Sequence, residues 1–158
     1  MTDSTGPQLL IIEDGDEYLR FFSRHLSHYD YRQARSFDAC MELLGGDGAE
    51  PDGIVLDIRF DRVPREDLIG DVEEIAEQLL GDPSDLESAW RYLSDNQGYL
   101  ILRALRDEGY TQPALMIADL PDRQRDNLER LYGTVGVVAS FERAAIQREL
   151  DRLLGRAG

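Results

Sequence analysis

The chain alternates five times between a short strand-like segment and an amphipathic helical segment, and this alternation limits the folds that it can adopt. Each strand-like segment is short and is bounded by turn residues or acids, which is typical of a β-strand. The five segments are QLLIIED (8–14), YRQARS (31–36), PDGIVLD (51–57), PALMIAD (113–119) and TVGVVAS (134–140). Strands that alternate with helices form a parallel sheet with both faces covered.

We therefore expect an α/β fold, a flavodoxin-like doubly wound five-stranded parallel sheet of order 2-1-3-4-5. A length of 158 residues suits a single domain over residues 1–158. In such sheets, ligands bind beyond the carboxyl ends of the strands. The residues that follow each strand are therefore the first candidates for a functional site.

Acidic residues end the first and third expected strands: Glu13 and Asp14 follow one, and Asp57 ends the other. Carboxylates that meet at one edge raise each other's pKa unless a cation lies between them. Mg²⁺ suits such a place, because it takes oxygen ligands and needs only one or two carboxylates. A carboxylate beside the ion can act as a nucleophile toward phosphorus. For Asp57 alone, a strand-end residue that caps a turn is the plain alternative.

These segments resemble the receiver domain of two-component response regulators. The resemblance is carried by IIEDGDEYLRFF (11–22), by IVLD (54–57) and by the alternation of strands and helices, and it covers nearly the whole chain apart from one insertion. It implies that Glu13 and Asp14 bind Mg²⁺ and that Asp57 accepts phosphate from a histidine kinase. It also implies that the backbone carbonyl of Arg59 is a metal ligand.

Arg59 has two open roles. Its guanidinium could contact the phosphoryl group, or it could be a solvated side chain that pairs with Asp61 or its neighbours.

The chain departs from the receiver pattern at the positions that switch in this family. Ala118 stands in place of a threonine or serine, Val137 in place of an aromatic residue, and Ser140 in place of a lysine. All 17 basic residues are arginines, so no lysine elsewhere can fill the last position. These switch positions are therefore degenerate. Ser140 is also expected to cap the last helix, and Asp119 to help cap a helix that starts near Pro121.

Residues 61–95 form an insertion between the third strand and the helix that should follow it, and we expect a helical hairpin there. Asp82 is the expected cap of its second helix, with Pro83 in the first turn. The insertion holds eleven acids and three arginines, which is more than half of the net charge of −15. It could be a structural pad, a lid over the acidic pocket, or a docking or dimerisation surface. Its apolar stripes favour the pad: Leu68, Val72, Ile75 and Leu79 in the first helix, and Leu86, Trp90 and Leu93 in the second.

The charge also limits the partners. A surface this acidic repels phosphate backbones and anionic lipids, so we expect neither nucleic acid nor a membrane as a partner of this chain. The single cysteine, Cys40, forms no intrachain disulfide and should be buried. The start MTDSTGPQ has no signal-peptide pattern, and we expect a soluble cytoplasmic protein. The resemblance implies a histidine kinase or another signalling protein as partner, and a homodimer stays open.

Three functions fit these observations. The first is an atypical receiver that accepts phosphate on Asp57 with Mg²⁺. The second is a phosphorylation-independent pseudo-receiver that acts as a protein-interaction module. The third, a hydrolase, is the weakest, because Arg59 stands where phosphatases of the haloacid dehalogenase type carry a second aspartate. We therefore expect a two-component signalling protein and not an enzyme.

Overall fold

The computed structural model describes residues 6–46, 48 and 50–155. Its five strands form one parallel sheet in the order β2-β1-β3-β4-β5, so the expected fold class is confirmed. The strands are β1 (Gln8–Ile12), β2 (Asp30–Ala34), β3 (Gly53–Leu56), β4 (Ala114–Ile117) and β5 (Val135–Val138).

No helix within these described ranges is long and apolar enough to cross a lipid bilayer. Most of the N-terminal segment used in the signal-peptide expectation lies outside the described residues.

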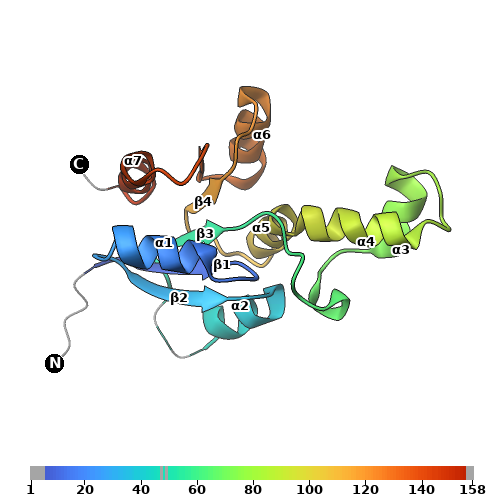
Figure 1. Ribbon diagram of the computed structural model, residues 1–158, viewed down its shortest axis with the longest axis horizontal. Helices are drawn as coiled ribbons and strands as arrows, with labels where there is room; N and C mark the ends of the chain where they lie inside the picture. The colour runs from blue at the N-terminus through green and yellow to red at the C-terminus, as the bar shows by residue number, and fades with distance from the viewer. Residues whose placement is uncertain (1–5, 47, 49, 156–158) are drawn as a thin grey trace.

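Helices cover both faces of the sheet (Figure 1). The helices that flank it are α1 (Glu17–His25), α2 (Phe37–Leu44), α5 (Gln97–Asp107), α6 (Asp122–Tyr132) and α7 (Arg143–Leu153). Successive side chains of a strand point to opposite faces, so each strand contributes to two cores. In β1, Leu10 and Ile12 pack with α2, α5 and α6, whereas Leu9 and Ile11 pack with α1 and α7.

The insertion between β3 and α5 is helical and extends away from the sheet (Figure 1). Its elements are η1 (Arg65–Asp67), α3 (Val72–Glu74), η2 (Ile75–Leu79) and α4 (Leu86–Asp95). Helix α3 continues directly into the π-helical turn η2, and the pair packs against α4 as a hairpin. Ala76 and Ala89 are fully buried within this hairpin, because small side chains let two helices approach closely. After Asn96, α4 leads into α5.

The two apolar stripes of the insertion are buried toward the sheet and exposed toward the turn of the hairpin. Leu93 is 1% exposed, whereas Leu79 is 55% and Leu86 is 41% exposed. The π-helical turn explains Leu79, because the Leu80 amide bonds to the Ile75 carbonyl, five residues back. A residue that α-helical spacing would place on the face of Ile75 is thereby rotated away from it.

Two of the expected helix caps are wrong. Helix α7 has Glu142 at its N-cap, and Ser140 lies two residues earlier, where its carbonyl accepts from the Glu142 amide at 2.8 Å. Helix α6 has Pro121 at its N-cap with no side-chain cap, and Asp119 is exposed. In both cases the first helical residue comes three positions after the expected cap, so that residue does not hold the N-cap.

The expected cap of α4 is also wrong. Asp85 holds the N-cap and accepts from the Ser88 amide at 3.2 Å. Asp82 instead closes the preceding turn, where its carboxylate accepts from the amide and hydroxyl of Ser84. Cys40 is fully buried, as expected.

Candidate functional site

The carboxyl ends of β1 and β3 bring Glu13, Asp14 and Asp57 to one edge of the sheet. Ile12 is paired with Leu56, and the Asp57 amide donates to the Ile12 carbonyl at 2.9 Å. The residues that follow these two strands are therefore neighbours. We call Glu13, Asp14 and Asp57 the acidic cluster. The sequence predicted that these residues share one edge, and the register of β1 and β3 brings their backbones there.

Glu13 is fully buried and is anchored to the start of α1. One carboxylate oxygen accepts from the Tyr18 amide at 3.0 Å, and the other accepts from the Leu19 amide at 2.9 Å and from Gln33 Nε2 at 2.9 Å. The carboxylate thereby accepts from two backbone amides that a helix start leaves without partners. Burial raises the pKa of Glu13, and the three hydrogen bonds act in the opposite direction.

Asp14 is held by the first residues of the insertion. Its Oδ2 accepts from the backbone amide of Arg62 at 2.7 Å. The guanidinium of Arg62 makes two hydrogen bonds, of 3.0 and 2.8 Å, to the carboxylate of Glu17. These bonds raise the pKa of Arg62, with a smaller contribution from the charge of Asp14. Arg62 thus brings a positive charge to the cluster, and nothing in the sequence singled it out from its neighbours.

Asp57 is partly buried and lies beside two other carboxylates. Burial and then the charge of Asp14 raise its pKa from 3.8 to about 6, and the charge of Glu13 adds to the same effect. Hydrogen bonds from the backbone amides of Arg59 and Ile58 to the carboxylate act in the opposite direction. Repulsion within a cluster of this kind is relieved when a cation binds.

Tyr18 of α1 covers Asp57. The phenol is 7% exposed and lies close enough to the Asp57 carboxylate to feel its charge. Burial first, and then the charges of Asp57 and Glu13, raise the pKa of Tyr18, so the phenol stays neutral. Its ring lies edge-on to Phe141, with centroids 4.9 Å apart. The sequence offered one signal for Tyr18 that we missed: it stands four residues before Phe22 and so shares the buried face of α1.

The three switch positions lie beyond the ends of β4 and within or after β5. Ala118 is half-buried, and its amide donates to the Val138 carbonyl at 2.8 Å. Val137 is half-buried against the core that contains α5 and α6. Ser140 is exposed on the loop before α7. None of the three side chains carries a cation or an aromatic ring, and Ser140 alone carries a hydroxyl.

The backbone that follows Asp57 is fixed to the insertion and to α5. Phe60 and Ser94 of α4 make two hydrogen bonds: the Phe60 amide donates to the Ser94 carbonyl at 2.8 Å, and the Ser94 hydroxyl donates to the Phe60 carbonyl at 2.6 Å. The Gly98 amide donates to the Ile58 carbonyl at 2.8 Å. A Cβ at Gly98 would overlap the Asp57 carbonyl, so only glycine allows this close approach.

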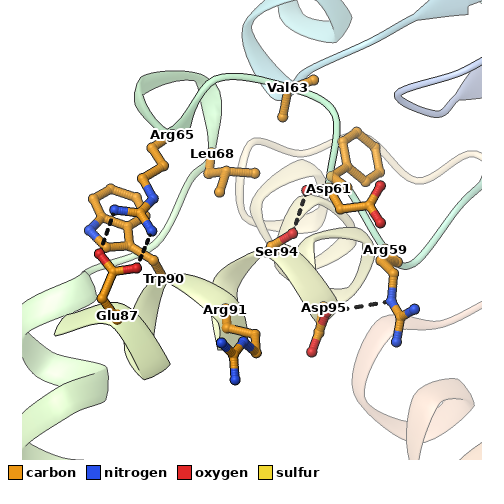
Figure 2. A pocket seen from close by; sticks show the side chains of 11 residues that line it. Arg59, Asp61, Val63, Arg65, Leu68, Glu87, Trp90, Arg91, Ser94 and Asp95 are labelled. Carbon is orange, nitrogen blue, oxygen red and sulfur yellow. Dashed lines mark hydrogen bonds and ion pairs between the residues drawn. The ribbon is translucent and has the colours of Figure 1, made fainter. Parts of the chain in front are cut away.

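Arg59 lies on the side of this loop that faces α4, in a cavity of about 560 Å³ (Figure 2). Its guanidinium is 66% exposed and pairs with Asp95 at 3.4 Å, rather than with the nearby Asp61. At the other end of the cavity, Arg65 makes two hydrogen bonds to Glu87 and lies over the ring of Trp90 at 5.4 Å (Figure 2).

The donor chemistry of the acidic cluster fits a hard divalent cation. Asp14 and Asp57 supply carboxylate oxygens, and no described residue donates a hydrogen bond to the Arg59 carbonyl. Within the described ranges, no three His, Cys, Asp or Glu side chains converge as a metal-binding group. The reason is that Glu13 turns both oxygens toward α1 and Gln33. Mg²⁺ tolerates such a sparse set, because it keeps several water ligands.

The comparisons with known proteins agree with this architecture. No family model matches the sequence, and no curated protein matches it. Among solved structures, a two-component response regulator from Clostridium difficile has a TM-score of 0.60 at 13% identity, over 95% of this chain and 97% of that one. The chemotaxis protein CheY4 of Vibrio cholerae has a TM-score of 0.59 at 15% identity, over 94% and 98%.

A third similar structure is the BeF3-activated N-terminal receiver domain of RstA from Klebsiella pneumoniae. It has a TM-score of 0.59 at 15% identity and covers 93% of this chain and 97% of that one. The chain therefore has the fold of response-regulator receiver domains, as the sequence resemblance predicted.

Proposed function

We propose that this chain is an atypical receiver domain of two-component (phosphorelay) signalling, with Asp57 as its phosphoacceptor. One observation carries the proposal beyond the fold. Asp57 directly follows β3, with its carboxylate held by the amides of Ile58 and Arg59 and beside the charge of Asp14. The proposed role is that of a signalling module and not of an enzyme.

The proposed reaction uses a phosphohistidine of a kinase as donor. An oxygen of ionised Asp57 forms the new bond to phosphorus, while the bond from phosphorus to the imidazole nitrogen breaks and its electron pair stays on the imidazole, which takes up a proton. The amides of Ile58 and Arg59 would orient the attacking carboxylate. Asp14, Asp57 and the Arg59 carbonyl would hold Mg²⁺, with Glu13 as a fixed charge behind them. When bound, Mg²⁺ offsets negative charge on the transferring group.

We further propose that the output step differs from the usual receiver switch. Ala118 has no hydroxyl to bond a phosphoryl oxygen, Val137 has no ring to turn, and Ser140 has no amine. Tyr18 lies beside Asp57, and its ring packs on Phe141 of the loop after β5. A phosphoryl group on Asp57 would displace the Tyr18 hydroxyl and thereby disturb Phe141.

A phosphorylation-independent pseudo-receiver is the second candidate, and the same contact favours it. The buried Tyr18 phenol lies beside Asp57, and the raised pKa of Asp57 weakens it as a nucleophile below pH 6. In this alternative, the helix faces and the insertion bind partners whatever the state of Asp57.

The deciding experiment is phosphorylation by phosphoramidate, a small donor with a phosphorus–nitrogen bond, in the presence of Mg²⁺. We expect intact mass to show one phosphoryl group on the wild type and on Asp119→Asn, and none on Asp57→Asn. Asp119 is the matched control, because it is an exposed acid at the end of the neighbouring strand β4.

Beryllofluoride with Mg²⁺ provides an independent measurement, since it imitates the phosphoryl group without a transfer step. We expect a change in the fluorescence of Trp90, the single tryptophan, because Ser94 of the same helix is bonded to the loop after Asp57. If phosphoramidate does not label the wild type and beryllofluoride does not change its fluorescence, the pseudo-receiver is the remaining function.

A further inference from the structure

Three leucines are exposed together at the turn of the inserted hairpin, where η2 ends and α4 begins. Leu79 is 55%, Leu80 is 39% and Leu86 is 41% exposed. We call these three residues the leucine tip. Single exposed leucines are common on protein surfaces, but three at one turn form an apolar patch with no internal partner. The π-helical turn that rotates Leu79 outward is also a feature frequently found at functional sites.

The segment that carries the leucine tip is rich in acids and has no basic residue. Residues 71–87 contain seven acids and no basic residue. Four of the acids interact with nearby residues of the insertion. Asp71, Asp82 and Asp85 cap turns or helix starts, and Glu87 pairs with Arg65.

The other three, Glu73, Glu74 and Glu77, are exposed on the α3 and η2 side of the hairpin. Within the described part of the chain, they form no ion pair. Their charge is therefore available to a partner.

We propose that the leucine tip and these three glutamates form a docking surface for a cationic amphipathic segment of another protein. The apolar side of such a segment would cover Leu79, Leu80 and Leu86, and its lysines or arginines would face Glu73, Glu74 and Glu77. Charge complementarity is what selects this occupant. The surface lies away from the acidic cluster, and the proposal does not depend on phosphorylation of Asp57.

The same charge argues against two other occupants. In a symmetric dimer a second copy would bring its own glutamates against these, and like charges across an interface disfavour association. An anionic lipid surface would be repelled for the same reason. The chain as a whole carries a net charge of −15, so the repulsion is not limited to the hairpin.

The test uses a fluorescein-labelled synthetic amphipathic helix of leucine and lysine as probe, with fluorescence anisotropy on the full chain. We expect the combined variant Leu79→Ser, Leu80→Ser and Leu86→Ser to weaken binding about tenfold or more. Leu131→Ser is the matched control, since Leu131 is 64% exposed on α6, and it should change binding less than about twofold. Far-UV circular dichroism of each variant verifies that the helices are retained.

A second pair of variants separates specific from general charge attraction. Glu73→Gln, Glu74→Gln and Glu77→Gln together should weaken binding more than Asp107→Asn, Glu108→Gln and Asp126→Asn together, which remove the same number of exposed charges from α5, α6 and the turn after α5. Amide shifts of the wild type with the probe should centre on residues 73–86. Because this measurement uses only the wild type, it holds even if one of the variants unfolds.

Four results would overturn the proposal: no binding of the probe, equal loss in the two charge variants, equal binding by the leucine variant and its control, or amide shifts centred elsewhere. Sedimentation that shows a wild-type dimer lost in the leucine variant would assign the surface to a second copy. Binding of vesicles of anionic lipid that depends on the leucines would assign it to a membrane.

Discussion

Each carboxylate of the acidic cluster is held by a different set of donors. Glu13 receives hydrogen bonds from α1 and Gln33, Asp14 from the insertion, and Asp57 from the two amides that follow it. Acids that look equivalent in sequence therefore have unequal freedom to meet a ligand. For Asp57, burial and then the charge of Asp14 outweigh its two amide donors, and its pKa is raised to about 6.

Asp57→Asn should stabilise the protein at pH 7.5 without Mg²⁺. A carboxyl group whose pKa is higher in the folded state than in the unfolded state binds its proton more readily when folded. Its ionisation therefore lowers the free energy of unfolding as the pH rises from about 4 to 6, and the cost persists above pH 6. After a discount for partial exposure, we expect a gain of about 1–2 kcal/mol in urea unfolding at pH 7.5.

This gain should disappear below about pH 3, where Asp57 is largely protonated in both states. Mg²⁺ should stabilise the wild type and have a much smaller effect on Asp57→Asn. Asp119→Asn serves as the control and should show neither the pH-dependent gain nor the altered Mg²⁺ response. A gain that is the same at both pH values would mean that the charge of Asp57 is not its cause.

At this scale, the sequence predicted which acids meet but not what holds them. The ends of parallel strands meet at one edge, so Glu13, Asp14 and Asp57 follow from the strand order alone. Arg62 contacts Asp14 across 48 residues of sequence through a loop whose path no periodicity describes. Arg59, for which both a phosphoryl contact and a solvated ion pair were open, pairs with Asp95 because α4 lies on its side of the loop.

Among the elements, helix α5 approaches β3 more closely than any side chain would permit. A Cβ on Gly98 would lie 2.7 Å from the Ile58 Cα and would overlap the Asp57 carbonyl. The first turn of α5 can therefore bond directly to the backbone beside the phosphoacceptor candidate.

Gly98→Ala should destabilise the protein by about 2–3 kcal/mol, because the added methyl group must displace backbone atoms. Denaturant unfolding would measure this change. Gly46→Ala is the control, because its nearest contact, to the Glu42 carbonyl at 3.4 Å, is an ordinary one. A Gly98 variant as stable as the Gly46 variant would show that α5 can retreat from the loop at little cost.

Helix α1 depends on Glu13 for the satisfaction of its first amides. Glu13→Ala should cost about 2–4 kcal/mol in unfolding free energy, since it leaves the amides of Tyr18 and Leu19 without their acceptor. Glu13→Gln should cost less, because its amide oxygen still accepts one of these bonds. Glu42→Ala, an exposed position on α2, is the control and should change stability by less than about 0.5 kcal/mol. Equal effects of Glu13→Ala and Glu42→Ala would contradict the anchoring role.

The sequence predicted helix existence better than helix boundaries. Ser36 caps α2 as its pattern indicates, with the Ala39 amide 3.1 Å from its hydroxyl. Ser140 and Asp82 have the same chemistry, but turns before α7 and α4 shift the first helical residue away from them. The π-helical turn at 75–79 was likewise invisible, since its hydrogen bonds differ from an α-helix by one residue.

For the whole molecule, charge is the dominant surface property. The net charge of −15 is carried by a chain whose described ion pairs are exposed or partly exposed, so most of the repulsion is felt through solvent. More than half of it resides in residues 61–95, which extend from the sheet as a hairpin (Figure 1).

Sodium chloride should therefore stabilise the protein. Raising its concentration from about 0.02 to about 0.3 M shortens the range of repulsion to a few ångströms. We expect the thermal midpoint to rise by about 5 °C. The variant Glu73→Gln, Glu74→Gln and Glu77→Gln should show a smaller rise, measured by circular dichroism. An unchanged thermal midpoint would mean that repulsion between the acidic side chains does not lower the stability of the fold.

The two hydrogen bonds between Phe60 and Ser94 have a thermodynamic consequence. They connect the segment after Asp57 directly to helix α4, so a shift of that segment on ligand binding would be passed to α4. Linkage is reciprocal: if occupation of Asp57 changes the affinity of the hairpin for a partner by some factor, the partner changes the stability of the occupied state by the same factor. A partner bound to the hairpin would then change the occupation of Asp57, just as occupation of Asp57 would change the binding of the partner.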